Sequence, residues 1–249
     1  MNKKIWILLV VTYLTVLMID APASILSRFI FQISKGQIEL ANTQGTVWRG
    51  AANPVFHQRN GSLVVLQQIR WEIATLTLLT GKVSANFFWQ EMPQKQPMTI
   101  SFSAKKLELQ NIYIPLPAML LTNISDFLKP AQLRGQLIFK SDSLSWTPTG
   151  WQGAATADWL NASSLISQIA PLGDYHLNFS ATSSGVSFDL STVAGALLLN
   201  GSGNFSTSGN FNFKATAKAE IGKEAALNEL LNHLGPEQGD GVHTFNLLQ

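Results

Sequence analysis

Apolar and polar residues alternate with a period of two in several segments of this chain. The alternation covers residues 82–87, 174–179, 186–190 and 210–218. Because successive side chains of a strand point to opposite faces of its sheet, this pattern predicts strands with one buried face and one solvated face. Short segments rich in Gly and Ser, such as 183–185 and 208–209, separate these strands and are typical of tight turns. We therefore predict a mainly β fold built on an antiparallel sheet.

The first 25 residues have the pattern of a segment that enters a membrane. Lys3 and Lys4 precede a run without charges, residues 5–19, and Asp20 ends the run. Positive charges before an apolar run keep the N-terminus in the cytoplasm and direct the following residues across the membrane. We predict a cytoplasmic N-terminus over residues 1–4, a transmembrane signal anchor over 5–22 and a translocated β domain over 23–249. The anchor side chains that we expect to contact lipid are Ile5, Trp6, Leu8, Leu9, Leu14, Leu17 and Ile19.

Two fates of this segment fit its pattern. Ala21 and Ala23 resemble a signal-peptide cleavage site, and the run is shorter than the about 20 residues that span a bilayer. Trp6 and Tyr13 favour an uncleaved helix, whose reach the long lysine side chains extend. A buried core helix is a third interpretation.

A helical period occurs in three short segments. Ile25, Phe29 and Ile33 lie four residues apart, which predicts a helix along the membrane surface or at the start of the folded domain. We predict a second short helix over residues 118–128, after a segment, 112–117, whose two prolines argue against a central strand. The third helix is predicted over 223–234, where an apolar stripe ends at Gly235 and Pro236.

Two parts of the chain resemble each other. The segment that begins at Trp48 and continues through Gly50 recurs at Trp151 and Gly153. Gly36 and Gly135 precede these segments, and further Trp and Gly landmarks follow in the same order. We therefore predict two similar β units, near residues 36–97 and 133–220, joined by a linker over 98–132. Repeated β units of this kind stack on their neighbours.

Composition excludes several classes of protein. The 249 residues include 17 Lys and Arg, 15 Asp and Glu, and no Cys, and charged residues make up 13% of the chain, against about 25% in a typical soluble protein. The apolar content of 46% excludes a disordered chain. The near-balance of charge gives no basic face for nucleic acid. The lack of cysteine excludes a disulfide scaffold and a thiolate metal site.

No pattern in the sequence points to catalysis or to a cofactor. The carboxylates are scattered, and no two of them have a spacing that forces them together. The four histidines, His57, His176, His233 and His243, lack the spacing of a metal-binding pair. Nucleophile-elbow and phosphate-loop motifs are missing as well. We therefore expect a protein that is not an enzyme and that has neither a metal nor another cofactor.

Tryptophan is the alternative place to look for a function. Six tryptophans lie after the apolar N-terminal run, at positions 48, 71, 89, 146, 151 and 159. They are interpreted either as core residues at strand corners, where each ring buries a large area, or as a surface that binds a partner or an apolar ligand. The recurrence of Trp-x-Gly favours the core interpretation, because duplicated corners repeat whereas a binding site need not.

Taken in order, these features resemble the type II secretion system protein N family. The resemblance is carried by the anchor ending at Pro22 and Ala23, by Gly45-Thr46-Val47-Trp48-Arg49-Gly50, by residues 66–71 and 78–81, and by the recurrence at 150–155. It continues through residues 230–235 and 239–241. The residues that we assign to the family motif or to structural corners are Gly45, Trp48, Gly50, Trp71, Gly81, Trp151, Gly153, Leu234 and Gly235.

The resemblance implies an accessory component of the machinery that exports folded proteins across the outer membrane. It implies an uncleaved single-pass anchor in the bacterial inner membrane, a C-terminal domain in the periplasm, contacts with other secretion-system subunits and no enzymatic activity. An alternative function follows from the sheet itself. A curved sheet lined by Phe87, Phe179, Phe188, Phe211 and Phe213 is able to form a trough that binds lipid or conducts it between membranes.

Overall fold

The computed structural model describes residues 5, 20–58, 61–90, 96–123 and 132–248. The chain divides into two compact units, residues 1–104 and 105–249. Of the predicted anchor residues, Ile5 is described and exposed, whereas Trp6, Leu8, Leu9, Leu14, Leu17 and Ile19 lie outside the described residues. No helix within the described ranges has the length and apolar content needed to cross a membrane.

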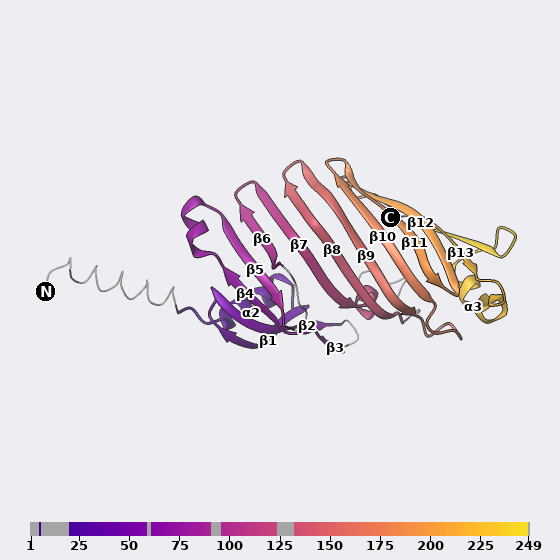
Figure 1. Ribbon diagram of the computed structural model, residues 1–249, viewed down its shortest axis with the longest axis horizontal. Coiled ribbons are helices and arrows are strands. Elements are labelled where there is room, and N and C mark those ends of the chain that lie inside the picture. Colours follow the sequence, from indigo (N-terminus) through magenta and orange to yellow (C-terminus); the bar gives the residue numbers. More distant parts are fainter. Residues whose placement is uncertain (1–4, 6–19, 59–60, 91–95, 124–131, 249) are drawn as a thin grey trace. The chain divides into compact units, whose positions relative to one another are not determined.

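Unit 1 is an antiparallel sheet with one helix packed against it (Figure 1). Its elements are α2 (Ser24–Ile33), β1 (Ile38–Gly45), β2 (Arg49–His57), β3 (Leu63–Val65), β4 (Ile69–Ile73), the 3₁₀ helix η1 (Thr75–Thr80), β5 (Val83–Trp89) and β6 (Met98–Ser103). The strands pair in the order β1-β2-β4-β5-β6, and β3 pairs with the end of β2.

Trp71 is the centre of the core of unit 1. Its side chain is 1% exposed and packs with Ala23, Leu40 and Ala52. The apolar side chains of α2 that face the sheet, Leu26 and Ile30, cover this cluster. The indole Nε1 of Trp71 donates a hydrogen bond to the carbonyl oxygen of Val47 at 2.9 Å, so the polar atom of the ring is satisfied although it is buried.

Unit 2 is an antiparallel meander in which each strand pairs with the next strand in the sequence (Figure 1). Its elements are β7 (Lys106–Pro117), the 3₁₀ helix η2 (Ala118–Asn123), β8 (Arg134–Thr147), β9 (Gly150–Ser163), β10 (Gly173–Thr182), β11 (Gly185–Gly195), β12 (Leu197–Ser206), β13 (Phe211–Ala219), α3 (Glu224–Leu234) and β14 (Val242–Leu248). The prediction of a mainly β, antiparallel fold with few helices is confirmed.

Helix α3 closes one end of the meander. Its buried side chains, Leu227, Leu230 and Leu231, pack against Leu197 on β12 and Ala217 on β13. The helix was predicted over residues 223–234 and forms over Glu224–Leu234. The carboxylate of Glu224 lies in its first turn, where backbone N–H groups hold the pKa of this side chain below its ordinary value.

The prolines at 115 and 117 were predicted to exclude a central strand, and the structure places them at the end of β7, in the part that pairs with β8. Pro115 pairs with Ile138 and Pro117 with Gln136 along the ladder between β7 and β8. Successive N–H groups of a strand point to opposite edges, so prolines two residues apart remove donors from one edge only. The pairing with β8 continues through both prolines. The predicted linker, 98–132, therefore contains β6, β7 and η2.

The landmarks of the predicted repeat do not occupy equivalent places. Trp48 and Trp151 both lie near the start of the second strand of a hairpin. In the first hairpin Gly45 pairs with Gly50, and in the second Thr147 pairs with Gly150. Trp71, however, lies on β4, opposite Gly50, whereas Trp159 lies on β9, the strand that also carries Trp151. Trp48 and Trp151 thus have similar positions in their hairpins, whereas Trp71 and Trp159 do not, and the two similar units stay a prediction.

Candidate functional site: an apolar groove in unit 2

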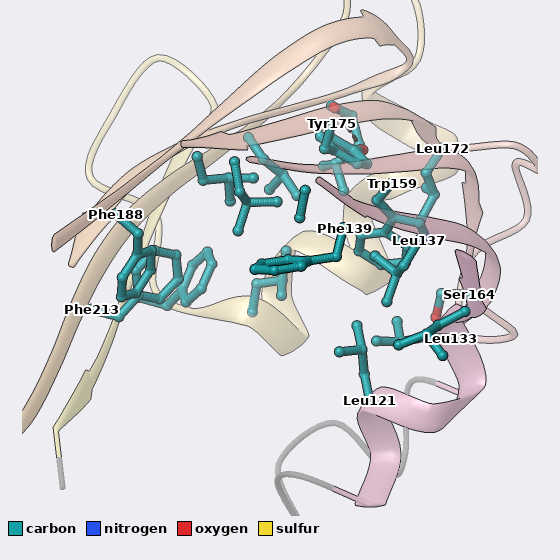
Figure 2. Close-up of a pocket in the computed structure, with 18 of the residues that line it drawn as sticks. Leu121, Leu133, Leu137, Phe139, Trp159, Ser164, Leu172, Tyr175, Phe188 and Phe213 are labelled. Carbon is teal, nitrogen blue, oxygen red and sulfur yellow. Dashed lines mark hydrogen bonds between the residues drawn. The ribbon is translucent and has the colours of Figure 1, made fainter. Parts of the chain in front are cut away.

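One face of the meander in unit 2 lines a groove with a volume of about 740 Å³. The lining comes from every strand of this unit. Figure 2 shows Phe188 and Phe213 at one end, Phe139 pointing into the middle, and Trp159, Tyr175 and Leu172 at the other end. The volume falls within the range of about 300–1,000 Å³ that is typical of ligand pockets.

The register of the strands explains why the lining is continuous. Phe139 on β8 lies opposite Ala157 on β9, Ala157 opposite Leu177 on β10, and Leu177 opposite Leu190 on β11. Directly opposed residues share a face of the sheet. Four neighbouring strands therefore contribute one apolar side chain each to a single row that crosses the sheet.

A chain of aromatic rings forms a second row. The ring centroids of Phe139 and Phe179 lie 6.1 Å apart, and those of Phe179 and Phe188 lie 5.8 Å apart. Phe213 continues the chain, at 5.3 Å from Phe188 and 5.8 Å from Phe245. These separations are those of favourable aromatic pairs. The rings thus form a connected aromatic surface from β8 to β14.

The groove has walls as well as a floor. Leu121 of η2 and Leu133 lie along one side, together with Ser164 from the loop that follows β9 (Figure 2). The last turn of α3 contributes Leu230, His233 and Leu234. Loop, 3₁₀ helix and α-helix therefore enclose the apolar face of the sheet, which would otherwise lie open to water.

Three polar side chains of the lining, Tyr175, Trp159 and Ser164, are hydrogen-bonded to the backbone. The hydroxyl of Tyr175 donates to the carbonyl oxygen of Leu197 at 2.9 Å, and the indole of Trp159 donates to that of Arg134 at 3.0 Å. Ser164 Oγ accepts from the backbone N–H of Ile166 at 3.3 Å. Within the described part of the chain, the one buried side-chain polar atom without a partner is Nε2 of Gln58, in unit 1. Burial, and to a lesser degree Asp174, raises the pKa of Tyr175.

The opposite face of the same strands is polar. Asp158 on β9 accepts a hydrogen bond from Lys140 Nζ at 2.7 Å and pairs with His176 Nδ1 at 2.6 Å. The second ring nitrogen of His176 lies 3.1 Å from Asn178 Oδ1. The hydrogen bond from Lys140, followed by that from His176, outweighs partial burial and lowers the pKa of Asp158. Charge is therefore kept on one face of the sheet and apolar surface on the other.

Residues 36–246 match the sequence model of the family described as type II secretion system (T2SS), protein N. The chain belongs to the type II secretion system protein N family. Neither a curated protein nor a solved structure matches it significantly.

The residues assigned to the protein N family motif gather mainly outside the groove. Gly50 lies against the ring of Trp71, and a Cβ at position 50 would collide with that ring. Gly45 ends β1 with a φ of +81°, and a Cβ there would lie 2.5 Å from the carbonyl oxygen of Arg49. The motif from Gly45 to Gly50 therefore forms a tight hairpin that carries Trp48 and packs on Trp71.

The remaining motif residues have separate places. Gly81 follows η1. Gly153 lies on β9, where a Cβ would be 2.5 Å from the carbonyl oxygen of Ser143. A Cβ at Gly235, directly after α3, would collide with the carbonyl oxygen of Thr244. Leu234 lines the groove. The structure thus brings Gly45, Trp48, Gly50 and Trp71 together and leaves the others apart.

The tryptophans of this protein N family member divide between the two interpretations. Trp71 and Trp89 are buried core residues. Trp146 and Trp151 face each other across β8 and β9 and are exposed. Trp159 is half-buried and lines the groove, where it contacts Tyr175 with the ring centroids 5.7 Å apart.

Sequence reasoning found part of the groove. Phe179, Phe188, Phe211 and Phe213, which were expected to line a trough, do so, whereas Phe87 lies on β5 in unit 1. Phe139 was missed, because it follows Leu137 and Ile138 in an apolar run without alternation. Ile138 is buried on the other face, and this extra apolar residue hides the period of two.

Proposed function

We propose that this chain is a non-catalytic component of the type II secretion machinery, tethered to the bacterial inner membrane with its β units in the periplasm. Family membership carries the proposal for the machinery. The tether and the orientation are supported by Lys3 and Lys4 before the uncharged run over 5–19. The domain boundaries that we propose remain residues 1–4, 5–22 and 23–249.

The geometry of the groove supports a non-catalytic role. General acids and bases need a titratable group that is free to exchange a proton with a substrate. In the lining, Tyr175 and Trp159 donate their hydrogen bonds to the backbone instead. The charged cluster around Asp158 lies on the opposite face. We therefore infer a binding or scaffolding role, with other secretion-system subunits as partners and without a cofactor.

Deletion of the gene tests the role in secretion. In a strain without a redundant secretion system, we expect exported enzymes to decrease in the medium and to accumulate in the periplasm. The matched control is a periplasmic protein that is not exported further, whose amount should stay constant. Unchanged extracellular activity in this strain would contradict the proposal. Alkaline extraction of membranes tests the tether separately, because a protein with a spanning segment stays in the pellet.

The continuous apolar lining favours a second function for the same protein, which is the binding of a lipid chain in the groove. A buried methylene group contributes about 0.8 kcal/mol, so about ten methylenes offer about 8 kcal/mol before the costs of binding are subtracted. Apolar side chains make up most of the lining, so recognition falls on the apolar chain of the ligand. Neutral acyl chains of membrane lipids have this chemistry.

Photo-crosslinking tests this second function. The full chain is exposed to a phospholipid with a diazirine in its acyl chain, and the crosslinked peptides are identified by mass spectrometry. We expect adducts on groove residues of β8 to β11. Ala157→Gln places an amide in the row between Phe139 and Leu177 and should reduce crosslinking severalfold, whereas Thr156→Gln, on the opposite face of the same strand, should not. Equal labelling of both variants would contradict lipid binding in the groove.

A further inference from the structure

The 3₁₀ helix η1 carries leucines into solvent at one end of unit 1. Leu76 is 79% exposed and Leu79 is 86% exposed, and Leu78 between them is exposed as well. The segment Thr75–Thr80 contains no charged residue. Leucine is among the residues that proteins most often bury, and exposed apolar residues that are contiguous mark contacts with a membrane or another protein. This tip of unit 1 is therefore a candidate contact surface.

Hydrogen bonds connect the tip to the point where the apolar N-terminal run joins the fold. The backbone N–H of Val47 donates to the carbonyl oxygen of Ala21 at 2.8 Å, and that of Ala23 donates to Gly45 at 3.1 Å. In the same turn, the carbonyl oxygen of Trp48 accepts from Ile73 at 2.7 Å, two residues before η1. Residues 21–25, 45–49 and 73–80 thus form one corner of unit 1, which we call the N-terminal corner.

Two threonine hydroxyls in the N-terminal corner are hydrogen-bonded to the backbone. The hydroxyl of Thr77 donates to the carbonyl oxygen of Ala74 at 2.6 Å, and that of Thr80 donates to Thr77 at 2.7 Å. These threonines satisfy backbone acceptors within η1, which lowers the cost of moving the segment out of water. Trp71 fixes the neighbouring turn through its bond to Val47.

The N-terminal corner follows directly on the apolar N-terminal run, and this position indicates its partner. The uncharged run over 5–19 ends directly before Asp20, and Ala21 already belongs to the corner. A run embedded in a bilayer therefore ends next to the turn at Val47 and Trp48, and this turn is hydrogen-bonded to Ile73, which precedes η1. Ile25, in the first turn of α2, is exposed on the same corner. Because the apolar N-terminal run is joined directly to the N-terminal corner, a lipid surface is the partner that we expect for this tip.

We propose that the N-terminal corner docks on the bilayer, with Leu76 and Leu79 inserted among the lipid chains. The proposal rests on the membrane tether that we propose above, and it adds a second contact that fixes the orientation of unit 1 on the membrane. Apolar side chains at an interface gain free energy when they enter the region between head groups and acyl chains. Trp48, in the same corner, belongs to the residue type that is enriched at this depth.

Leu63 provides a matched control in the same unit. It is an exposed leucine on β3, where it pairs with His57 at the end of β2. The corner lies at the other end of β2, next to Arg49. Arg49 and His57 are eight residues apart along β2, which corresponds to about 26 Å of strand. A bilayer that contacts Leu79 at the corner is therefore not expected to reach Leu63.

Because the chain has no cysteine, a single introduced cysteine is the one site that a thiol-reactive spin label modifies. The full chain is purified as the variants Leu79→Cys and Leu63→Cys, labelled with a nitroxide and reconstituted into vesicles of phosphatidylethanolamine and phosphatidylglycerol. Collisions with oxygen, which concentrates in lipid, are compared with collisions with a water-soluble nickel chelate. We expect the oxygen-to-nickel ratio to be severalfold higher at position 79 than at position 63.

The outcomes separate this proposal from the tether. If the chain floats with the vesicles and both labels have the ratio of an aqueous site, the docking proposal is wrong and the tether stands. A label at position 79 that is shielded from both reagents would indicate a protein contact and would also overturn the proposal. If the chain does not float with the vesicles, both proposals fail.

Discussion

Phe188 stacks on Phe213 across Gly203, with the ring centroids 5.3 Å apart and the planes at 26°. The two rings belong to β11 and β13, and β12 runs between these strands. Gly203 is opposite both residues in the register, so the absence of a side chain at this position leaves the space in which the rings meet. The aromatic row of the groove therefore depends on a glycine in the middle strand.

A side chain at position 203 is expected to break this stack. In Gly203→Ala, the new Cβ would collide with the ring of Phe188 and lie 2.7 Å from the carbonyl oxygen of Asn212. We expect the free energy of unfolding to fall by about 1–3 kcal/mol, as in other overpacked sites, and the near-ultraviolet circular dichroism to change. Urea unfolding checks the first effect. The control is Ser202→Ala, an exposed neighbour on β12, which should unfold like the wild type.

The indole of Trp71 is expected to stabilise unit 1 through its hydrogen bond. Trp71→Phe keeps an aromatic ring but removes the donor to Val47 and the contact with Gly50. We expect a loss of about 1–3 kcal/mol in the free energy of unfolding, because the buried carbonyl oxygen loses its partner. Trp151→Phe, at a side chain that is 37% exposed, is the matched substitution and should cost much less. Equal costs would contradict this account of the hairpin.

The cluster around Asp158 is expected to make stability depend on acid pH. Lys140, and after it His176, lower the pKa of Asp158 in the folded chain below its ordinary value of 3.8. The contribution of the carboxylate is therefore present above the unfolded pKa and is lost as the pH falls through the folded pKa. Asp158→Asn should be less stable than the wild type at about pH 6, and the difference should shrink towards about pH 2.

Chemical unfolding at both pH values measures this difference. Asp189→Asn, at an exposed position on β11, two strands from β9, is the control and should leave the free energy of unfolding nearly unchanged. A stability difference for Asp158→Asn that stays constant down to the lowest pH would show that the carboxylate acts through shape rather than charge.

Tyr175 is expected to make the free energy of unfolding decrease at alkaline pH, whereas the contribution of Asp158 is lost at acid pH. Burial raises the pKa of its phenol above the ordinary value of 10.0. The stabilisation is therefore complete below pH 10.0 and decreases as the pH rises, because the unfolded phenol ionises while the folded one keeps its proton. Tyr175→Phe should lose this pH dependence. It should also lose about 1–3 kcal/mol at neutral pH, since the carbonyl oxygen of Leu197 loses its donor.

The sequence alone was sufficient to predict the strands that have one apolar and one polar face. Residues 174–179 and 186–190 alternate cleanly, and they form β10 and β11 with Phe179 and Phe188 on the apolar face. The helix over 223–234 was visible because its apolar stripe ends at Gly235. These elements are predictable because the pattern of apolar and polar residues within each one reflects which of its side chains are buried.

Features that depend on neighbours were hidden. The prolines in β7 argued against a strand, because the sequence does not tell which edge of the strand is paired. Phe139 was obscured by the buried Ile138 beside it. The groove walls were not predictable either, because Leu121, Ser164 and Leu230 come from three separate connections. Their meeting results from the tertiary packing of unit 2 and leaves no common pattern in the sequence.

The strictly sequential pairing in unit 2 makes its groove modular. Every strand from β7 to β14 joins the strand that follows it in the chain. Removing two neighbouring strands, such as β11 and β12, would leave the direction of β13 unchanged and its apolar residues on the same face, whereas removing one strand would reverse both. A hairpin is therefore the smallest increment by which evolution or engineering is able to lengthen or shorten this groove while its lining stays apolar.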